Sequence, residues 1–362
     1  MPKINRNKRK EELINIFFMI ASFIVALNLY NLFRYFGLEE MDKIPQIPIS
    51  FTEITFNAFF GGIIVGTILG ILDNVLNRQN IRQKSFGVVL TLKTFSFLLT
   101  FFLTISVVFL TTHTLLNKEP FQQAFSELLI FYTEKTFFAI LVYGLVVIFF
   151  INLVKLINRK MGPGILIKFI SGRYHKPREE ERIFMFLDLK SSTTIAEKLG
   201  HFKFSRLIQD CFYDLTDFVK NYNAEIYQYV GDEAVITWKL KNGLIDDNCI
   251  HFYFAYKEQL LRRSEYYEKS YGLVPQFKAG INCGKVTVAE VGEVKTEIAY
   301  HGDVLNTTAR IQSMCNVFGK ELLISEFLKD ELDLNEFNVN NMGEIMLKGK
   351  IKPVTIYSIE QK

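Results

Sequence analysis

Two aspartates stand where strand-like segments end in the second half of the chain. Asp188 closes the apolar run "RIFMFLDL", and Asp232 lies in the turn of "YQYVGDEAVITW". If the two strands are neighbours in one sheet, both carboxylates converge at the same end of it. Two hard oxygen ligands that share a site suit Mg²⁺ or Mn²⁺ and leave room for substrate phosphates. Taken alone the pair is weak evidence, because aspartate is common at strand ends and in turns.

A second polar group lies nearer the C-terminus. In "YHGDVLNTTARIQ", Asn306 and Arg310 are spaced i, i+4 near the start of a predicted helix, so they project from one face. An amide followed by a guanidinium can hold a ribose ring and a charged phosphoryl transition state together. Lys348 in "LKGK" offers a point charge for terminal phosphates. Each could be a solvated surface group, and it is the combination that indicates phosphoryl transfer assisted by two metal ions.

Short strands alternate with helices from about residue 182 onward, and these elements must position the polar groups. The strand that ends at Asp188 is followed by two predicted helices in "SSTTIAEKLGHFKFSRLIQDCFYDLTDFVKNY". A hairpin, a longer helix, further strands and the helix of Asn306 come next. The central order βααββαβ is that of a ferredoxin-like α/β sandwich.

The first part of the chain has a different composition. The protein has 362 residues, 49% of them hydrophobic and 35 of them Phe, and the apolar runs crowd into roughly the first 155 positions. Their lengths predict four membrane helices. These cover approximately 13–34, 55–76, 87–110 and 134–156, and the second is weakest because four glycines dilute it. The alternative, a buried soluble bundle, would normally show polar helix faces.

Basic segments flank these helices and give their orientation. "KINRNKRK", "NRQNIRQK" and "KLINRK" predict a multi-pass protein of the cell (inner or plasma) membrane, with both termini and the second domain in the cytoplasm. These segments are expected to meet anionic membrane lipid. They also account for much of the net charge of +4, so no nucleic-acid partner is inferred.

A few polar residues fall inside or beside the apolar runs. Lys93 and the pair Glu134–Lys135 carry charges that are energetically unfavourable inside a bilayer. They mark either a sensing site or groups that snorkel to the interface or pair across the helix bundle. Only His113 lies near a membrane helix, at an outer end, which argues against a haem held by two histidines. The cysteines all follow the membrane region without CxxC spacing, which suits free thiols rather than disulfides or zinc; they are Cys211, Cys249, Cys283 and Cys315.

Gly162, Pro163 and Gly164 break the fourth helix, and Ile165 to Ile170 restart a short amphipathic one. This segment is either a transmitting hinge or a passive tether. We therefore expect a four-helix transmembrane domain over 1–157, a connecting segment over 158–180 and an α/β domain over 181–362.

The second domain resembles the catalytic domain of class III nucleotide cyclases, the adenylate and guanylate cyclases, over roughly 180 to 360. The motifs "FLDLKSST", "YVGDEAV", "GINCGKV", "HGDVLNTTARI" and "LKGK" stand in the order of that family. The resemblance implies a ferredoxin-like cyclase fold, with two Mg²⁺ or Mn²⁺ ions on Asp188 and Asp232. It also implies a head-to-tail homodimer in which each site takes its metals from one chain and its remaining groups, Asn306, Arg310 and Lys348, from the other.

The resemblance assigns further residues to the substrate. Lys285, in "CGKV", stands where relatives often carry a phosphate-binding Arg. Ser191 and Ser192 replace the glycine and aromatic residue usually found after the first Asp, and with Thr193 their backbone amides can still contact phosphate at a helix N-terminus. Glu233, beside the second Asp, is interpreted as an incidental neighbour.

Two positions that read the purine depart from the family pattern. Gln228 and Ala299 stand where adenylate cyclases commonly carry a Lys and an Asp or Thr. An amide can donate to adenine or accept from guanine, and Ala offers no side-chain partner, so the residues leave the base open. The resemblance favours ATP, because bacterial relatives with atypical base-reading residues mostly make cyclic AMP.

The sequence thus favours a membrane-bound adenylate cyclase, with a guanylate cyclase as the alternative. A diguanylate cyclase would share the hairpin, but it predicts Gly-Gly-Asp-Glu-Phe where this chain has Val-Gly-Asp-Glu-Ala. A catalytically silent membrane receptor is the remaining alternative, and the two intact aspartates argue against it.

Overall fold

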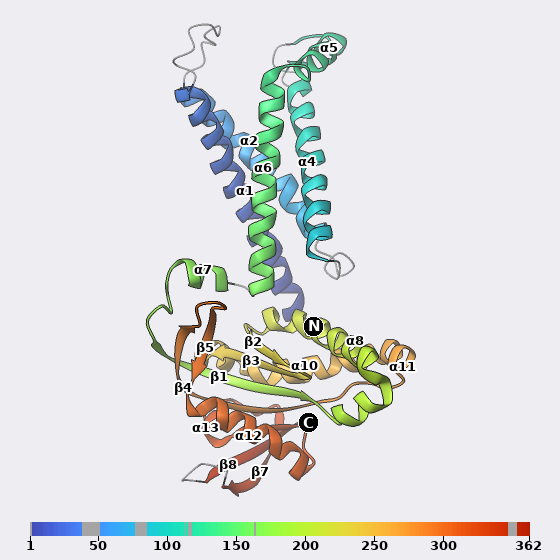
Figure 1. Ribbon diagram of the computed structural model, residues 1–362, viewed down its shortest axis with the longest axis vertical. Helices are drawn as coiled ribbons and strands as arrows, with labels where there is room; N and C mark the ends of the chain where they lie inside the picture. The colour runs from blue at the N-terminus through green and yellow to red at the C-terminus, as the bar shows by residue number, and fades with distance from the viewer. Residues whose placement is uncertain are drawn as a thin grey trace. The chain divides into compact units, whose positions relative to one another are not determined.

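The structure is a computed structural model that describes residues 2–37, 51–76, 85–111, 113–114, 118–162, 164–346 and 353–362 (Figure 1). The chain divides into an N-terminal unit, Met1–Met161, and a C-terminal unit, Gly162–Lys362.

Among the described residues of the N-terminal unit, four helices are long and apolar enough to cross a membrane, over Glu12–Phe33, Thr55–Leu76, Phe86–Thr111 and Lys135–Met161. These segments agree with the four predicted spans to within a few residues. They belong to α1 (Pro2–Gly37), α2 (Phe51–Leu76), α4 (Phe86–Thr111) and α6 (Lys135–Met161). The structure also has α5 (Phe121–Phe131), a short helix between the last two spans that the sequence did not predict.

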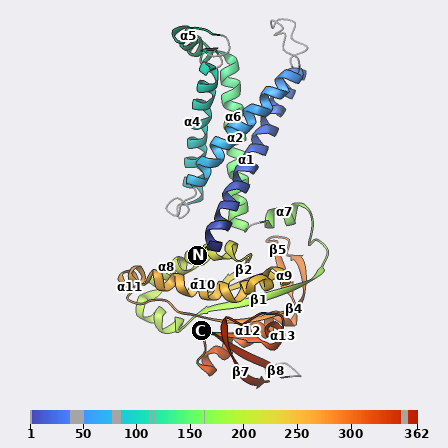
Figure 2. The same cartoon turned by 180° about the vertical axis from the view of Figure 1, so that it is seen from behind.

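The glycines of α2 let it lie directly against α1, and the two helices run side by side in both views (Figures 1 and 2). A Cβ atom added at Gly66 would lie 2.4 Å from the Cα of Ile20, and one added at Gly62 would lie 2.7 Å from the Cα of Ile24. Small residues four apart permit this close approach of the two helix backbones. The close approach increases van der Waals contact between the helices, which matters in lipid because there is no hydrophobic effect to drive their association. Thus the glycines that weaken the hydrophobicity of this span build its packing surface.

A buried ionic cluster joins all four long helices. Asp73 of α2 is fully buried, and its Oδ1 lies 2.6 Å from Nζ of Lys93 on α4. Its Oδ2 accepts from Nδ2 of Asn15 on α1 at 3.0 Å and pairs with Lys155 of α6. Lys93 therefore pairs across the bundle, the second of the two roles considered for it. Glu134, just before α6, and Lys135, at its start, are exposed.

The C-terminal unit is built on one sheet of mixed direction. Its path is β2-β3-β1-β4-β6-β8-β7, and β5 pairs with β4 beside that path. Neighbouring strands are antiparallel except for β4 and β6, which are parallel. The strands are β1 (Arg178–Leu189), β2 (Glu225–Val230), β3 (Glu233–Lys239), β4 (Phe277–Val291), β5 (Glu297–His301), β6 (Leu322–Ser325), β7 (Phe337–Ile345) and β8 (Val354–Gln361).

Helices cover both faces of this sheet. The helical elements are α7 (Ile165–Ile170), α8 (Ser192–Asn221), α9 (Leu240–Leu244), η2 (Ile245–Asp247), α10 (Asn248–Arg262), α11 (Ser264–Tyr271), α12 (Asp303–Phe318) and α13 (Glu326–Lys329). The predicted helix pair after β1 is present as α8, whose two parts meet at Gly200. The order confirms the predicted α/β cyclase-type fold, and the short connecting helix begins and ends where the sequence placed it.

Strand alternation separates two apolar layers. Ile183, Met185 and Leu187 of β1 pack into the larger core beneath α8, α10 and α11. Phe184 and Phe186 point to the opposite face, where residues of β4, β5 and α12 cover them. Asp188 continues the even-numbered series, so it lies at the end of this second face.

The packing of α1 against α2 can be tested by adding one methyl group. We expect Gly66→Ala to destabilise the N-terminal unit by about 1–3 kcal/mol, because the new Cβ must displace the α1 backbone. The matched control is Gly87→Ala on α4, where an added Cβ meets no atom within 4 Å. Thermal unfolding of the full chain in detergent measures both. Equal midpoints for the two variants would contradict the close approach.

Candidate active site

The register of three strands sets a row of charged residues across the second face of the sheet. Asp188 of β1 pairs with Glu233 of β3 on one side and with Lys278 of β4 on the other. Asp232 occupies the turn between β2 and β3, next to Glu233. The structure therefore brings Asp188 and Asp232 to the same end of the sheet, as their strands suggested.

The carboxyl groups of this row repel one another. Burial raises the pKa of the Asp188 carboxyl above its usual value, and the charge of Asp232 adds to the rise, while Lys278 opposes it. The pKa of Glu233 is raised to about 7, mainly by burial and further by the charges of Asp188 and Asp232. Glu233 is thus an electrostatic neighbour of both aspartates. The interpretation that it is incidental to the chemistry stays a prediction.

Two residues that the sequence analysis overlooked hold Asp188 in place. Nζ of the buried Lys278 lies 3.1 Å from Asp188 Oδ2 and donates to Asn316 Oδ1 at 3.0 Å. Nε2 of Gln312, on α12, donates to the same Asp188 oxygen at 3.0 Å. Gly280 of β4 makes this reach possible, because a Cβ there would lie 2.3 Å from the backbone nitrogen of Gln312.

The carboxylates suit a divalent metal ion. Asp232 Oδ2 is buried and has no hydrogen-bond partner among the residues that the structure describes. An orphaned buried carboxylate oxygen is costly, and a cation would compensate it. Together with Asp188 it offers the hard oxygen ligands that Mg²⁺ and Mn²⁺ prefer, so the residues present fit the expected ions.

Asn306 and Arg310 lie one turn apart on α12, where Asn306 is exposed and Arg310 is half-buried. Within the described part of the chain, neither side chain bonds to Asp188 or Asp232. The opposite side of the helix faces the sheet through Gln312. A single chain therefore brings the two aspartates together but does not join them to Asn306 and Arg310.

The segment after Asp188 turns sharply into α8. Ser191 has φ of +55°, a left-handed conformation that favours glycine. Its carbonyl accepts from the N–H of Ile195 at 3.0 Å. Ser192 opens the helix and Thr193 is exposed in its first turn, so this helix N-terminus follows directly on the carboxylate row.

The two expected base-reading positions lie on strands whose adjacent residues touch. Gln228 is exposed on β2 just after an irregularity in its pairing with β3, and Ala299 is half-buried on β5. The rings of Tyr227 and Tyr300, one residue from each, meet edge to face with centroids 4.9 Å apart. This contact brings the two positions to one region of the fold.

A buried arginine ties this region to the connecting helix. Arg182 Nη1 donates to the Tyr300 hydroxyl at 2.6 Å, and its Nη2 lies 3.0 Å from Glu225 Oε2 on β2. Lys168 of α7 pairs with the same oxygen at 3.0 Å. Burial acts to raise the pKa of Glu225, but Arg182 and Lys168 hold it below its usual value. The connecting helix is thereby bonded to the strand that carries Gln228.

Of the two expected phosphate-binding lysines, the structure describes Lys285 and does not bring it to the carboxylates. Lys285 is exposed on β4, and strand alternation puts it on the face of Ile281 rather than the face of Lys278. Lys348 lies outside the described residues.

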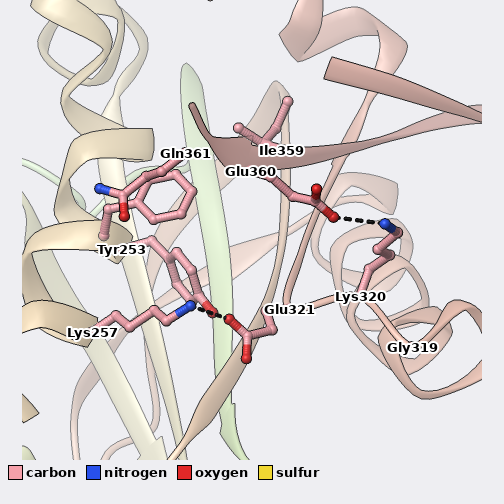
Figure 3. A pocket seen from close by; sticks show the side chains of 9 residues that line it. Tyr253, Lys257, Gly319, Lys320, Glu321, Ile359, Glu360 and Gln361 are labelled. Carbon is pink, nitrogen blue, oxygen red and sulfur yellow. Dashed lines mark hydrogen bonds and ion pairs between the residues drawn. The ribbon is translucent and has the colours of Figure 1, made fainter. Parts of the chain in front are cut away.

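A cavity of about 360 Å³ lies elsewhere in the C-terminal unit (Figure 3). It is lined by residues of α10, of the turn that precedes β6, and of β8. Two ion pairs lie in its wall, Lys257–Glu321 and Lys320–Glu360, each with an N–O distance of 2.6 Å. Burial acts to raise the pKa of Glu321, but Lys190 and Lys257 hold it below its usual value. None of the predicted site residues lines this cavity, so we do not assign it to the same chemistry.

Comparison with known proteins gives a consistent result. A family model described as the adenylate and guanylate cyclase catalytic domain matches residues 174–361. Adenylate cyclase 2 of Rhizobium meliloti (strain 1021) is 34% identical over 221 residues, which are 61% of this chain and 61% of that protein. The receptor-type guanylate cyclase gcy-4 of Caenorhabditis briggsae is 21% identical over 54% of this chain and 17% of its own length. This chain thus spans less than two thirds of the curated relatives that it matches.

Among solved structures, a bacterial light-regulated adenylyl cyclase superposes with a TM-score of 0.54 at 18% identity. The superposition covers 64% of this chain and 68% of that chain, and it shows a shared fold.

Lys278 should stabilise the carboxylate row in the absence of added metal. We expect Lys278→Met to destabilise the C-terminal unit by about 1–3 kcal/mol, because Asp188 then loses a charged hydrogen-bond donor. The loss should be larger at about pH 8 than at about pH 5.5, since Glu233 ionises as the pH rises through its raised pKa and adds repulsion. Urea unfolding at the two pH values measures it.

The control is Lys320→Met, which removes a more exposed partner of Glu360 and should cost only about 0–1 kcal/mol. Equal losses in the two variants, with no dependence on pH, would show that Lys278 does not compensate the carboxylates.

Proposed function

The chain belongs to the class III nucleotide cyclases, the family of adenylate and guanylate cyclase catalytic domains, and from that premise we propose that it converts ATP to 3′,5′-cyclic AMP and pyrophosphate. The observation that carries the proposal is the convergence of Asp188 and Asp232 beside the N-terminus of α8, where one buried carboxylate oxygen has no hydrogen-bond partner among the described residues. The 34% identity to an adenylate cyclase favours ATP over GTP. The family match also favours cyclisation of one nucleotide over synthesis of a cyclic dinucleotide.

In the proposed reaction the 3′-hydroxyl oxygen of the ribose attacks the α-phosphorus. A new O–P bond forms, the bond to the β-phosphate oxygen breaks, and pyrophosphate leaves while the hydroxyl proton passes to solvent. Two Mg²⁺ or Mn²⁺ ions, when bound, would lower the pKa of that hydroxyl and neutralise charge on the leaving group. The chain's own part is to hold those ions through Asp188 and Asp232, and Gln312 and Lys278 fix the orientation of Asp188.

The remaining groups act on the nucleotide in this proposal. Asn306 positions the ribose, and Arg310 stabilises the charge that develops on the transferring phosphoryl group. The first-turn amides of α8, from Ser191 to Thr193, contact phosphate. Lys348 and Lys285 are proposed to bind the triphosphate, and Gln228 and Ala299 to border the purine.

Two chains are proposed to complete each site. In one chain the aspartates are not joined to Asn306 and Arg310, and both groups of residues are at least partly exposed. Apolar surface is also exposed on the β4–β5 hairpin, at Val291 and Val294. A head-to-tail homodimer would bring the aspartates of one copy to α12 of the other and form two equal sites.

The four long helices are proposed to anchor this enzyme in the cell membrane. Basic segments at the chain start and at the C-terminal end of α6 favour an arrangement with both termini and the catalytic unit in the cytoplasm, where those segments meet anionic lipid.

Loss of a metal-binding carboxylate should abolish the reaction. We expect Asp232→Asn to lower cyclic AMP formation by at least about 100-fold with Mn²⁺ and ATP, because it removes a charged ligand rather than a supporting contact. Chromatography of the nucleotide products measures it, with GTP tested in parallel. Cyclic product at the wild-type rate from Asp232→Asn would overturn the metal assignment, and product from GTP alone would reverse the choice of base.

Complementation between chains tests the dimer. Asp232→Asn and Arg310→Ala chains with different tags are coexpressed and purified through both tags. Each heterodimer then holds one intact site, so its activity should be about half that of the wild type. Heterodimers of Asp188→Asn with Asp232→Asn serve as the matched control and should stay inactive, because both changes fall on the same half of a site. Rescue in the control and none in the test pair would refute the shared site.

A further inference from the structure

Three side chains of types that can bind metal ions lie close together in the N-terminal unit, between the end of α4 and the middle of α5. Nδ1 of His113 lies 2.8 Å from Oε2 of Glu119 and 3.0 Å from Oε2 of Glu127. One ligand atom from each residue lies within 4.8 Å of the others. His113 follows α4 by two residues, Glu119 precedes α5, and Glu127 stands within α5.

Neighbouring groups hold these side chains in position. The His113 ring stacks on Phe109 of α4, with centroids 4.2 Å apart and planes 15° apart. The backbone N–H of Glu119 donates to the carbonyl of His113 at 3.0 Å. Nε2 of Gln123 donates to Oε1 of Glu127 at 3.1 Å, which leaves Oε2 directed at the histidine. Supporting contacts of this kind orient the ligands in metal sites.

The charges of the cluster are not balanced by its own members. Two carboxylates share one imidazole nitrogen, and even a protonated imidazole would leave a net negative charge. A divalent cation between a neutral imidazole and two carboxylates gives a net charge of zero. Ligands at about 2.0–2.2 Å from a tetrahedral metal ion lie about 3.3–3.6 Å from one another. The two separations between His113 and the glutamates, 2.8 and 3.0 Å, therefore need to open by about 0.3–0.8 Å.

The donor set selects the kind of ion. One imidazole nitrogen with two carboxylate oxygens suits first-row transition ions, whereas Mg²⁺ and Ca²⁺ prefer oxygen alone. The side chain of His113 is 23% exposed and that of Glu127 is 36% exposed, so water can complete the coordination. We infer that His113, Glu119 and Glu127 form a binding site for a divalent transition-metal ion, which holds Zn²⁺ more tightly than Mn²⁺.

The place of this site in the chain separates it from the proposed catalytic metals. α6 begins at Lys135, shortly after α5, and the C-terminal unit follows its other end at Met161. The ion ties the end of α4 to α5 and thereby restrains the connection that leads into α6.

Zinc binding to the full chain tests the inference. Every protein compared carries Asp232→Asn, so that the proposed catalytic site contributes less to binding, and metal is first removed with a chelator. Competition with a chromophoric chelator then gives the affinity for Zn²⁺. We expect one site per chain, weakened at least about 10-fold by His113→Ala and by Glu127→Gln, and unchanged by Gln122→Ala on the exposed side of α5.

X-ray absorption at the zinc edge should show one imidazole among nitrogen and oxygen ligands, and this imidazole signal should disappear in His113→Ala. Glu127→Gln keeps the side-chain shape, so its result stands even if His113→Ala fails to fold. Equal zinc affinity in the background protein and Glu127→Gln, or equal affinity for Mg²⁺ and Zn²⁺, would overturn the inference. The readout is binding and not cyclase activity, so a failure here is distinct from a failure of the proposed function.

Discussion

Electrostatic repulsion among Asp188, Asp232 and Glu233 is the constraint around which the catalytic unit is arranged. The three carboxyl groups meet because β1 pairs with β3 and because the β2–β3 turn is tight. Lys278, on the strand at the other side of β1, supplies a compensating charge within the protein. The same repulsion makes a divalent cation favourable there, because an added positive charge offsets the mutual repulsion of the carboxylates.

The close approach of α12 to β4 supports this arrangement through packing. Gly280 leaves space for the helix backbone, and Gln312 then reaches Asp188 from the side facing the sheet. The outward side of the same helix carries Asn306. One helix therefore orients a carboxylate in its own chain while its outward side stays available, as the proposed dimer with two shared sites requires.

The N-terminal unit also contains a buried carboxylate, but there positive groups outnumber it. Asp73 is fully buried, and two ammonium groups and an amide surround it, so that each long helix supplies one member of the cluster. Breaking such a cluster leaves an uncompensated charge in an apolar environment, which is far more costly than the loss of an exposed pair. The cluster fixes the register of the helices, while the glycines of α2 set the distance between α1 and α2.

The sequence by itself determined the long apolar helices, the short connecting helix and the alternation of strands and helices, because these follow from local periodicity and from glycine and proline breaks. It also predicted that Asp188 and Asp232 lie at the same end of the sheet, since their positions at a strand end and in a turn are local features. It missed α5, whose 11 residues lie in a loop with mixed polarity. Only the tertiary structure showed that Glu233 lies beside the two aspartates and that Lys278 and Gln312 contact Asp188. It also showed that Lys93 forms an ion pair with Asp73. The physical reason is that strand register and helix approach juxtapose residues far apart in the chain, and the energy of a charge depends on those neighbours rather than on its place in the sequence.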